Sequence, residues 1–342
     1  MAVMGLSLAV MVEDRSQVSE ARRAAVSLAE RAGLDERSRS DVGIVATEAA
    51  TNLIKHAKGG EVLVGVLEGP RGLGLELVCV DKGPGMRDVE ACLADGYSSG
   101  GTLGGGLGAM RRLADDFSVW SSVGAGTALV CRFYPRAVPA ANGVRPMIAG
   151  LAVPIRGESA CGDAWTSVER PEGPALLVAD GLGHGPAAAD AAGTAVRLFR
   201  ESIWTHPEQV LNSLHAGMRS TRGAAVAVAL IDRARRELRF AGVGNISGVL
   251  VAGDKTRSLV SHSGTLGHQM RKAQEFVYPW ESGTLLVLHS DGLATHWKLD
   301  RYPGLFRQDP ALVGAVLYRD HARGRDDASV VVCRLSAEEA AA

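Results

Sequence analysis

The chain has 342 residues, of which 46% are hydrophobic and 22% charged, and its formal net charge at pH 7 is −1. This length and composition are typical of a soluble globular protein with about two domains. The nearly neutral charge argues against a dedicated nucleic-acid binder, and no stretch of about 18 apolar residues predicts a membrane span. We therefore expect neither nucleic acid nor a membrane among the partners.

The cysteines indicate the compartment. Their number is odd and none forms a C-x-x-C pair, so neither a disulfide framework nor a zinc site is expected, and we predict buried thiols in a reducing cytoplasm. The five are Cys79, Cys92, Cys131, Cys161 and Cys333. The apolar segment from Met1 to Met11 lacks a positive leader and a small-residue cleavage site, so we expect a first strand rather than a signal peptide.

Two amphipathic helices are predicted next. Apolar side chains fall on one helical stripe over residues 17–32, and a longer helical pattern covers residues 36–57. Within the longer one, Glu48, Asn52 and His56 recur every four residues and therefore share one face of the predicted helix. Polar residues in such a row are usually a solvated face, so alone they define no site.

A predicted strand pair, residues 61–68 and 74–80, leads to two glycine-rich stretches. The first is Asp81-Lys-Gly83-Pro-Gly85, and the second runs from Gly100 to Gly108 just before a helical pattern. The amides of such a loop, with a helix N-terminus behind them, can hold phosphate. No P-loop motif is present, and the glycines do not follow a first strand as a Rossmann motif requires.

Together with Gly124-Ala-Gly126-Thr127, these motifs resemble the GHKL ATP-binding fold, and within it the small serine kinases of anti-sigma and stressosome switches, over residues 1–134. The resemblance implies that Asn52 holds Mg²⁺, that Asp81 accepts a hydrogen bond from the adenine amino group, and that Glu48 is the base orienting an acceptor serine hydroxyl. The other implied cofactor-binding residues shape the base pocket or wrap the phosphates of ATP: Gly83, Gly85, Gly104, Gly106, Gly108 and Thr127.

Two relatives of this fold do not fit. The first histidine of the chain is His56, so no phosphoacceptor histidine precedes the ATP motifs as in a two-component sensor kinase. The ATPase machines of the superfamily carry a transducer domain, whereas here a linker rich in proline, alanine and glycine, residues 135–145, leads to a different domain. Extended, such a linker spans up to about 35 Å, so two sites would share a high effective concentration for one partner.

Residues 146–336 predict a β-sandwich flanked by helices. Helices are expected over residues 190–204 and 311–317. Strands over residues 224–231 and 237–241 are expected to pair across a charged turn, with residues 248–252 continuing the same sheet. The predicted fold class is therefore α+β, with an N-terminal GHKL (Bergerat) α/β sandwich followed by a β-sandwich.

Four acidic points lie at predicted strand ends in this second half. Apolar runs end in Asp180-Gly181 and in Ser290-Asp291-Gly292, Asp163 follows Gly162, and Asp326-Asp327 precede a strand. One Asp-Gly after a strand is usually only a turn. Four carboxylates gathered by folding, with the Gly181 carbonyl beside them, would form an oxygen-rich cluster that suits Mg²⁺ or Mn²⁺ rather than zinc.

These motifs, with Gly183-His184-Gly185, resemble the SpoIIE-like branch of the PPM-type metal-dependent Ser/Thr protein phosphatases. The resemblance implies that Asp180 bridges two metal ions, that the Gly181 carbonyl binds one of them, and that three further carboxylates complete the ligand set: Asp163, Asp291 and Asp326. Gly162 stands where many eukaryotic relatives carry an acidic residue. A two-metal site can generate a hydroxide nucleophile at neutral pH, so no covalent nucleophile is needed.

Two nearby side chains are expected to have structural roles. His184 could donate a proton to the leaving oxygen, but a histidine beside a glycine turn more often packs or hydrogen-bonds, which we favour. Asn245, in Val243-Gly-Asn245-Ile, is expected to cap a turn, although the segment is similar to a motif of stressosome feedback phosphatases.

The two halves predict a fused bacterial switch enzyme. Its first half would use MgATP to phosphorylate a STAS-domain antagonist or scaffold protein, and its second half would remove the phosphate with Mn²⁺ or Mg²⁺; a sigma or anti-sigma factor is a further candidate partner. One alternative is a phosphatase whose GHKL half only binds a partner and lets ATP set the affinity. Another is a phosphatase acting on a small phosphorylated metabolite.

Overall fold

The structure is a computed structural model that describes residues 7–69, 71–93, 106–135, 147–202 and 205–337. It divides into two units. The N-terminal unit comprises Met1–Pro146, Leu299–Arg319 and Ala342, and the C-terminal unit comprises Met147–Lys298 and Asp320–Ala341. The segment Leu299–Arg319, which the predicted boundaries of 146–336 place in the second half, is therefore grouped with the first.

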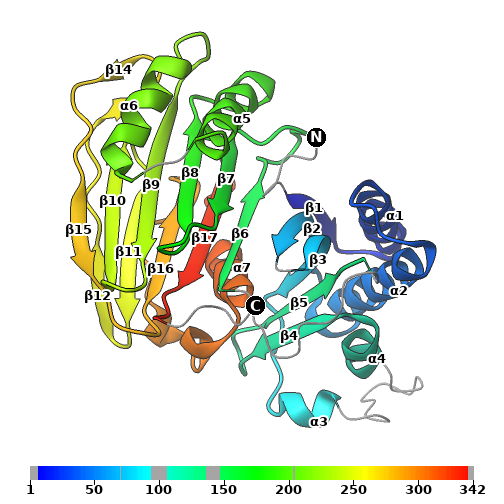
Figure 1. The fold of residues 1–342 in the computed structure, drawn as a ribbon. Helices are drawn as coiled ribbons and strands as arrows, with labels where there is room; N and C mark the ends of the chain where they lie inside the picture. The colour runs from blue at the N-terminus through cyan, green and yellow to red at the C-terminus, as the bar shows by residue number, and fades with distance from the viewer. Residues whose placement is uncertain (1–6, 70, 94–105, 136–146, 203–204, 338–342) are drawn as a thin grey trace. The chain divides into compact units, whose positions relative to one another are not determined.

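The N-terminal unit has a five-stranded antiparallel sheet in the order β1-β2-β3-β5-β4, with helices α1 and α2 on one face (Figure 1). Asp14 caps α1 with a capping box, in which Gln17 Oε1 accepts a hydrogen bond from the Asp14 amide, and Asp35 caps α2. The strands are β1 (Ser7–Val12), β2 (Gly60–Gly69), β3 (Gly72–Asp81), β4 (Asp116–Ser121) and β5 (Thr127–Phe133), and the helices are α1 (Arg15–Arg31), α2 (Glu36–Asn52), α3 (Val89–Leu93) and α4 (Gly106–Leu113).

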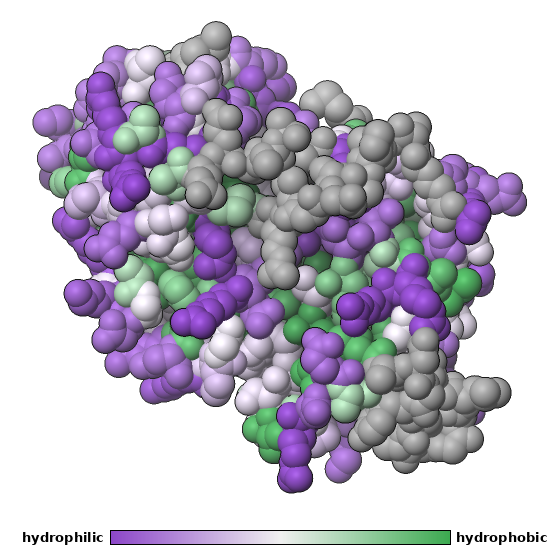
Figure 2. All heavy atoms as spheres, turned by 60° about the horizontal axis from the view of Figure 1, so that its bottom comes forward, coloured by the Kyte–Doolittle hydropathy of each residue, from purple (hydrophilic) through white to green (hydrophobic). Residues whose placement is uncertain are grey.

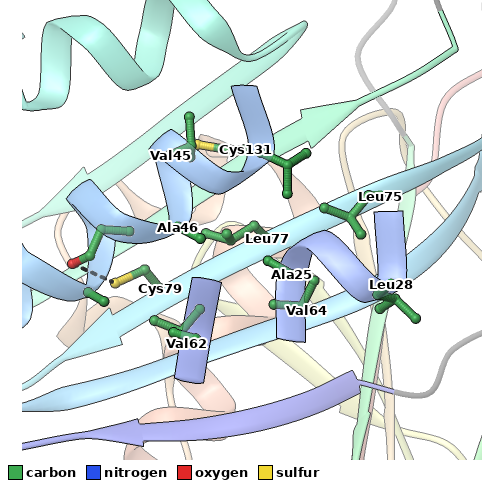
Figure 3. Packing of buried hydrophobic residues seen from close by; sticks show 14 of the residues in the cluster. Ala25, Leu28, Val45, Ala46, Val62, Val64, Leu75, Leu77, Cys79 and Cys131 are labelled. Carbon is green, nitrogen blue, oxygen red and sulfur yellow. Dashed lines mark hydrogen bonds between the residues drawn. The ribbon is translucent and has the colours of Figure 1, made fainter. Parts of the chain in front are cut away.

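One face of this sheet forms the core of the unit. Alternate strand residues point to the same face, and those facing α1 and α2 are apolar (Figure 3). The Cys79 thiol donates a weak hydrogen bond to the Ala49 carbonyl at 4.0 Å, which ties β3 to α2. The helical residues in Figure 3 are Ala25, Leu28, Val45 and Ala46, and the strand residues are Val62, Val64, Leu75, Leu77, Cys79 and Cys131.

The second predicted helix is not continuous to residue 57. The α-helix ends at Asn52, and Leu53–Ala57 form a π turn that stops at Lys58, whose φ is 61°. The wider turn delivers the chain to β2, which starts at Gly60. Glu48 and Asn52 therefore lie on the α-helix, whereas His56 lies in the π turn that follows it.

The C-terminal unit contains two five-stranded sheets, ordered β15-β10-β9-β8-β7 and β12-β11-β16-β17-β6. Apolar side chains from both sheets share one buried cluster, which confirms the predicted sandwich. A second cluster packs the first sheet against α5 (Pro186–Arg200) and α6 (Pro207–Gly217). The strands are β6 (Ile148–Val153), β7 (Asp163–Val168), β8 (Ala175–Gly181), β9 (Ala224–Asp232), β10 (Glu237–Val243), β11 (Ser247–Ala252), β12 (Lys255–Ser258), β13 (Gly264–Thr265), β14 (Gln269–Met270), β15 (Phe276–Pro279), β16 (Leu285–His289) and β17 (Ala328–Arg334).

Two details of the predicted second half were wrong. The strand over residues 248–252 does not continue the sheet of β9 and β10, because β11 pairs with β12 and β16 in the other sheet. The helix expected from residue 190 begins earlier, at Pro186, which follows the positive-φ Gly185 and needs no amide donor at a first helical position. It ends at Arg200, and Trp204 lies outside the described residues.

On the face drawn in Figure 2, hydrophilic side chains predominate and the hydrophobic ones lie in groups between them. All five cysteines are unpaired thiols, as predicted. Four of them are buried, whereas Cys92 is only partly buried, so the expectation of a buried thiol was wrong there. In the described parts of the chain, no helix combines the length and the hydropathy that crossing a membrane requires.

Candidate functional site

The four predicted acidic points come together at one end of the C-terminal unit. Asp163 at the start of β7 lies directly opposite Asp180 near the end of β8 in the strand register. Asp291 follows β16 and Asp326 precedes β17, and these two strands pair with each other. Gly292 lets them approach closely, because a Cβ there would lie 1.9 Å from the Asp327 carbonyl oxygen.

The carboxylates repel one another. Burial, together with the negative charges of Asp163, Asp291 and Asp326, raises the pKa of Asp180 to about 8. Burial also raises the pKa of Asp163 to about 7, although the Ser290 and Ser329 hydroxyls nearby favour its charged form. The Asp180 carboxyl therefore stays largely protonated at neutral pH unless a cation compensates the charge.

The donor set fits a hard divalent cation. Asp163 is 3% exposed, and within the described parts of the chain its Oδ2 has no hydrogen-bond partner, which is costly for a buried oxygen. Among the same residues, no three Asp, Glu, His or Cys side chains already stand as a closed ligand set. The carboxylates therefore converge without forming a closed cage, and the Oδ2 atom of Asp163 is unused by the protein and fits a cation as its partner.

Asp327 acts as a brace. Its Oδ1 accepts from the Ile155 amide and its Oδ2 from the Gly162 amide, both at 2.7 Å, so both oxygens are used. This leaves Asp326 as the exposed member of the pair. A Cβ on Gly162 would lie 2.8 Å from Asp327 Oδ2, so the absence of an acidic residue at position 162 has a steric and electrostatic reason.

Two side chains beside the cluster had no predicted role in it. The Asn245 Nδ2 donates to Asp291 Oδ2 at 2.8 Å, so its amide orients a carboxylate of the cluster rather than only capping a turn. Arg222 lies against the loop after Asp180, with Nη1 3.3 Å from the position of a Cβ on Gly183. The acidic residue and glycines at the end of a predicted strand indicated the loop after Asp180, but no sequence spacing indicated that Asn245 or Arg222 would lie beside the cluster.

His184 has the favoured structural role. Its Nδ1 lies 3.1 Å from Glu158 Oε1, so the histidine hydrogen-bonds as expected. Both side chains are partly exposed. The pair fixes the ring at the edge of the loop that begins with Gly181.

The second predicted site lies in the N-terminal unit. Glu48 and Asn52, one turn apart on α2, both reach the first residue of α4: a Cβ on Gly106 would lie 3.4 Å from Glu48 Oε2 and 3.5 Å from the Asn52 amide atoms. A carboxylate, an amide and a helix N-terminus therefore share one place. Gly108 is buried in the same helix, whereas Gly104 lies outside the described residues.

Asp81 is the last residue of β3 and lies opposite Thr127 on β5. Its carboxylate binds backbone amides of both neighbouring segments. Its Oδ1 accepts from the Gly83 amide at 2.7 Å and from the Thr127 amide at 3.2 Å. Burial raises the pKa of Asp81, and the positive charge of Arg319 and His56 opposes that increase. Gly85 has φ of +72° and passes so close to Ser122 that a Cβ would lie 2.0 Å from its carbonyl oxygen.

The sequence comparisons agree with both geometries. Residues 11–133 match the family model described as a histidine kinase-like ATPase domain, and residues 170–336 match that of stage II sporulation protein E (SpoIIE). The chain therefore belongs to the histidine kinase-like ATPases through its RsbT-like first part, and joins to it a phosphatase domain of the SpoIIE, PPM type.

Particular relatives make this concrete. The serine/threonine-protein kinase RsbT of Bacillus subtilis (strain 168) is 30% identical over 109 residues, covering 32% of this chain and 82% of RsbT. The phosphoserine phosphatase RsbX of the same organism is 27% identical over 139 residues, covering 40% of this chain and 69% of RsbX. A chain solved in work on the bacterial stressosome, described as a modular system adapted to control secondary messenger signalling, is 28% identical with a TM-score of 0.52, covering 55% of this chain and 98% of that one.

Proposed function

We propose that the chain phosphorylates and dephosphorylates one class of partner, a STAS-domain antagonist or scaffold protein of a stressosome or sigma-factor pathway. The ATP-binding kinase domain is assigned to residues 1–134 and the phosphatase domain to residues 146–336, with Leu299–Arg319 packed in the N-terminal unit. The proposal depends above all on the convergence of Asp163, Asp180 and their acidic neighbours. These carboxylates repel one another unless divalent cations neutralise their charge, and such cations are what a metal-dependent phosphatase requires.

In the phosphatase half, four carboxylates and one carbonyl would hold Mn²⁺ or Mg²⁺. When bound, two such ions supply Lewis acidity that activates water and neutralises charge on the phosphoryl oxygens. Asn245 keeps the Asp291 carboxylate oriented, and the Arg222 guanidinium, beside the Gly183 loop, is placed to attract a phosphate dianion. The holding groups are Asp163, Asp180, the Gly181 carbonyl, Asp291 and Asp326.

In the kinase half, the acceptor hydroxyl would meet Glu48, which removes its proton as the phosphoryl group arrives. Asn52 would hold Mg²⁺, and the N-terminus of α4 at Gly106 and Gly108 would face the phosphates of ATP. Asp81 would accept from the adenine amino group. The proximity of Glu48 to Asn52 and Gly106 favours a kinase over a module that only binds ATP, because binding alone requires no base at that place.

The test measures phosphate transfer and release on a purified STAS-domain candidate with ATP and Mn²⁺. Wild type is compared with Glu48→Ala and Asp180→Ala, and with the exposed controls Glu36→Ala on α2 and Asp190→Ala on α5. We expect phosphoprotein to accumulate only in Asp180→Ala, because its kinase site is intact while release of phosphate is blocked.

Three other outcomes separate the alternatives. Phosphorylation that persists in Glu48→Ala would make the assignment of the base wrong. No phosphorylation by any variant, with dephosphorylation of a pre-phosphorylated partner by wild type, would reduce the first half to an ATP-dependent binding module. Faster hydrolysis of small phosphate esters than of phosphoprotein would favour a metabolite phosphatase.

A further inference from the structure

The segment Leu299–Arg319 interrupts the phosphatase sequence between Asp291 and Asp326, yet it belongs to the N-terminal unit. It contains two short 3-10 turns, Leu299–Arg301 and Leu305–Arg307, and most of α7 (Pro310–His321), drawn in orange in Figure 1. Every α7 residue from Pro310 to Tyr318 is buried. The segment is therefore not a surface excursion.

A buried ion pair fastens the segment to the sheet. Arg132 on β5 makes two hydrogen bonds to Asp309, at 2.7 and 2.8 Å, and a third to Glu76 on β3. Arg132 is 2% exposed and Asp309 5% exposed. A charge buried this deeply is strongly destabilising when its partner is removed. The ion pair therefore makes the folded sheet and the folded segment depend on each other.

The edge strand β4 makes a second attachment. The Trp120 indole donates to the Pro303 carbonyl at 3.0 Å, and the Trp120 ring meets Tyr302 edge-on at 5.9 Å. Tyr318 on α7 donates to Glu61 on β2 at 3.2 Å. These contacts hold α7 in one position along the sheet and so fix where its last residues point.

The next residue reaches the wall of the nucleotide site. The Arg319 Nη1 donates to the backbone carbonyl of Asp81 at 2.8 Å, and its guanidinium lies over the Trp120 ring at 5.8 Å. A Cβ on Gly126 would lie 2.9 Å from Arg319 Nη1 and 2.1 Å from the Asp81 oxygen, so this turn is packed directly against the arginine. Arg319 therefore contacts both the strand end and the turn that place the Asp81 carboxylate.

We propose that Arg319 is a positioning residue of the nucleotide pocket: through the Asp81 carbonyl and the Gly126 turn, a segment of the phosphatase sequence sets how the Asp81 carboxylate meets the amino group of adenine. The inference rests on the proposed ATP site. The inference predicts an effect on recognition of the adenine ring alone. Arg319 contacts Asp81, the residue assigned to adenine, and does not contact α4, the helix assigned to the phosphates.

The experiment measures the affinities of the full chain for MgATP and for MgITP, whose base lacks the amino group. We expect Arg319→Ala to weaken MgATP binding about tenfold, as fits the loss of a charged hydrogen bond, and to leave MgITP binding unchanged, so that the preference for adenine collapses. Arg319→Lys keeps the charge and one donor and should restore most of the preference. Arg307→Ala, an exposed arginine in the same segment, is the matched control and should change neither affinity.

Equal losses for both nucleotides in Arg319→Ala, or an unchanged preference in all variants, would overturn the inference. If Arg319→Ala does not fold, Arg319→Gln and Arg319→Lys take its place. A preference for MgATP over MgITP that equals the wild-type preference in both of these variants would also overturn the inference. Wild type that binds neither nucleotide would instead refute the proposed ATP site itself.

Discussion

The buried carboxylate of Asp163 makes a prediction that opposes the usual effect of changing a core residue. In the absence of divalent cations, Asp163→Asn should stabilise the C-terminal unit near pH 8. The wild-type carboxylate must ionise there although burial and the charges of Asp326 and Asp327 raise its pKa to about 7. The asparagine carries no charge and avoids that cost.

The magnitude follows from the pKa difference. A group whose pKa is raised on folding contributes stability that is fully present below its unfolded pKa, about 4 for aspartate, and is lost as pH rises through its folded value. The gap between about 7 and about 4 corresponds to roughly 4 kcal/mol, since one pKa unit is about 1.4 kcal/mol. Asp180 shares the repulsion, so we expect a gain of about 2 to 4 kcal/mol at pH 8 and none at pH 4.

Urea denaturation followed by tryptophan fluorescence measures this, with chelator and then with Mn²⁺. Mn²⁺ should stabilise wild type and not the variant, which reverses their order. Asp327→Asn is the control: because asparagine has one acceptor oxygen, either the Ile155 or the Gly162 amide loses its acceptor, which should destabilise by about 1 to 3 kcal/mol. Destabilisation by Asp163→Asn at pH 8 with chelator, or a gain that does not change with pH, would refute the reasoning.

Three further substitutions test neighbouring features. Asn245→Ala should raise the Mn²⁺ concentration for half-maximal phosphatase activity about tenfold, since it removes a donor that orients a ligand; an unchanged metal titration would contradict this. Gly126→Ala should weaken ATP binding more than Gly124→Ala, because both have positive φ but only at Gly126 would the Cβ collide with backbone; equal effects in a binding assay would argue against close packing there. Arg222→Ala should raise KM for phosphoprotein several-fold with little change in kcat, whereas the control Arg219→Ala should leave both KM and kcat unchanged. A fall in kcat with an unchanged KM would exclude a role of Arg222 in attracting the substrate.

The predicted fold agrees with the structure wherever local pattern and tertiary packing act together. The strand over residues 61–68 and its partner 74–80 alternate because one face packs on two helices, and the structure pairs them. The run before Asp180 is apolar throughout because one face of β8 packs against the other sheet and its opposite face packs against α5. What the pattern could not show is which sheet a strand joins: nothing in the composition of residues 248–252 indicates β16 as the partner rather than β9.

The candidate site shows the same limit. Acidic residues at strand ends predicted the cluster, because glycine turns after apolar runs have a local signature. Asn245 and Arg222 are tied to the cluster only through folding, and no spacing joins Asn245 to Asp291, 46 residues later. The π turn at His56 was also not predicted. The spacing of apolar residues in a helix that ends in one π turn is almost the same as in a helix that is α throughout.

The brace formed by Asp327 restricts how this protein can evolve. With both oxygens of Asp327 occupied and one of them 2.8 Å from where a Cβ on Gly162 would lie, an acidic residue at position 162 and the brace exclude each other. An acidic residue gained at position 162 would require the loss of Asp327 first, and a chain without that aspartate would hold the loop at Ile155 less firmly. We therefore expect positions 162 and 327 to change together in any lineage that gains an acidic residue at position 162.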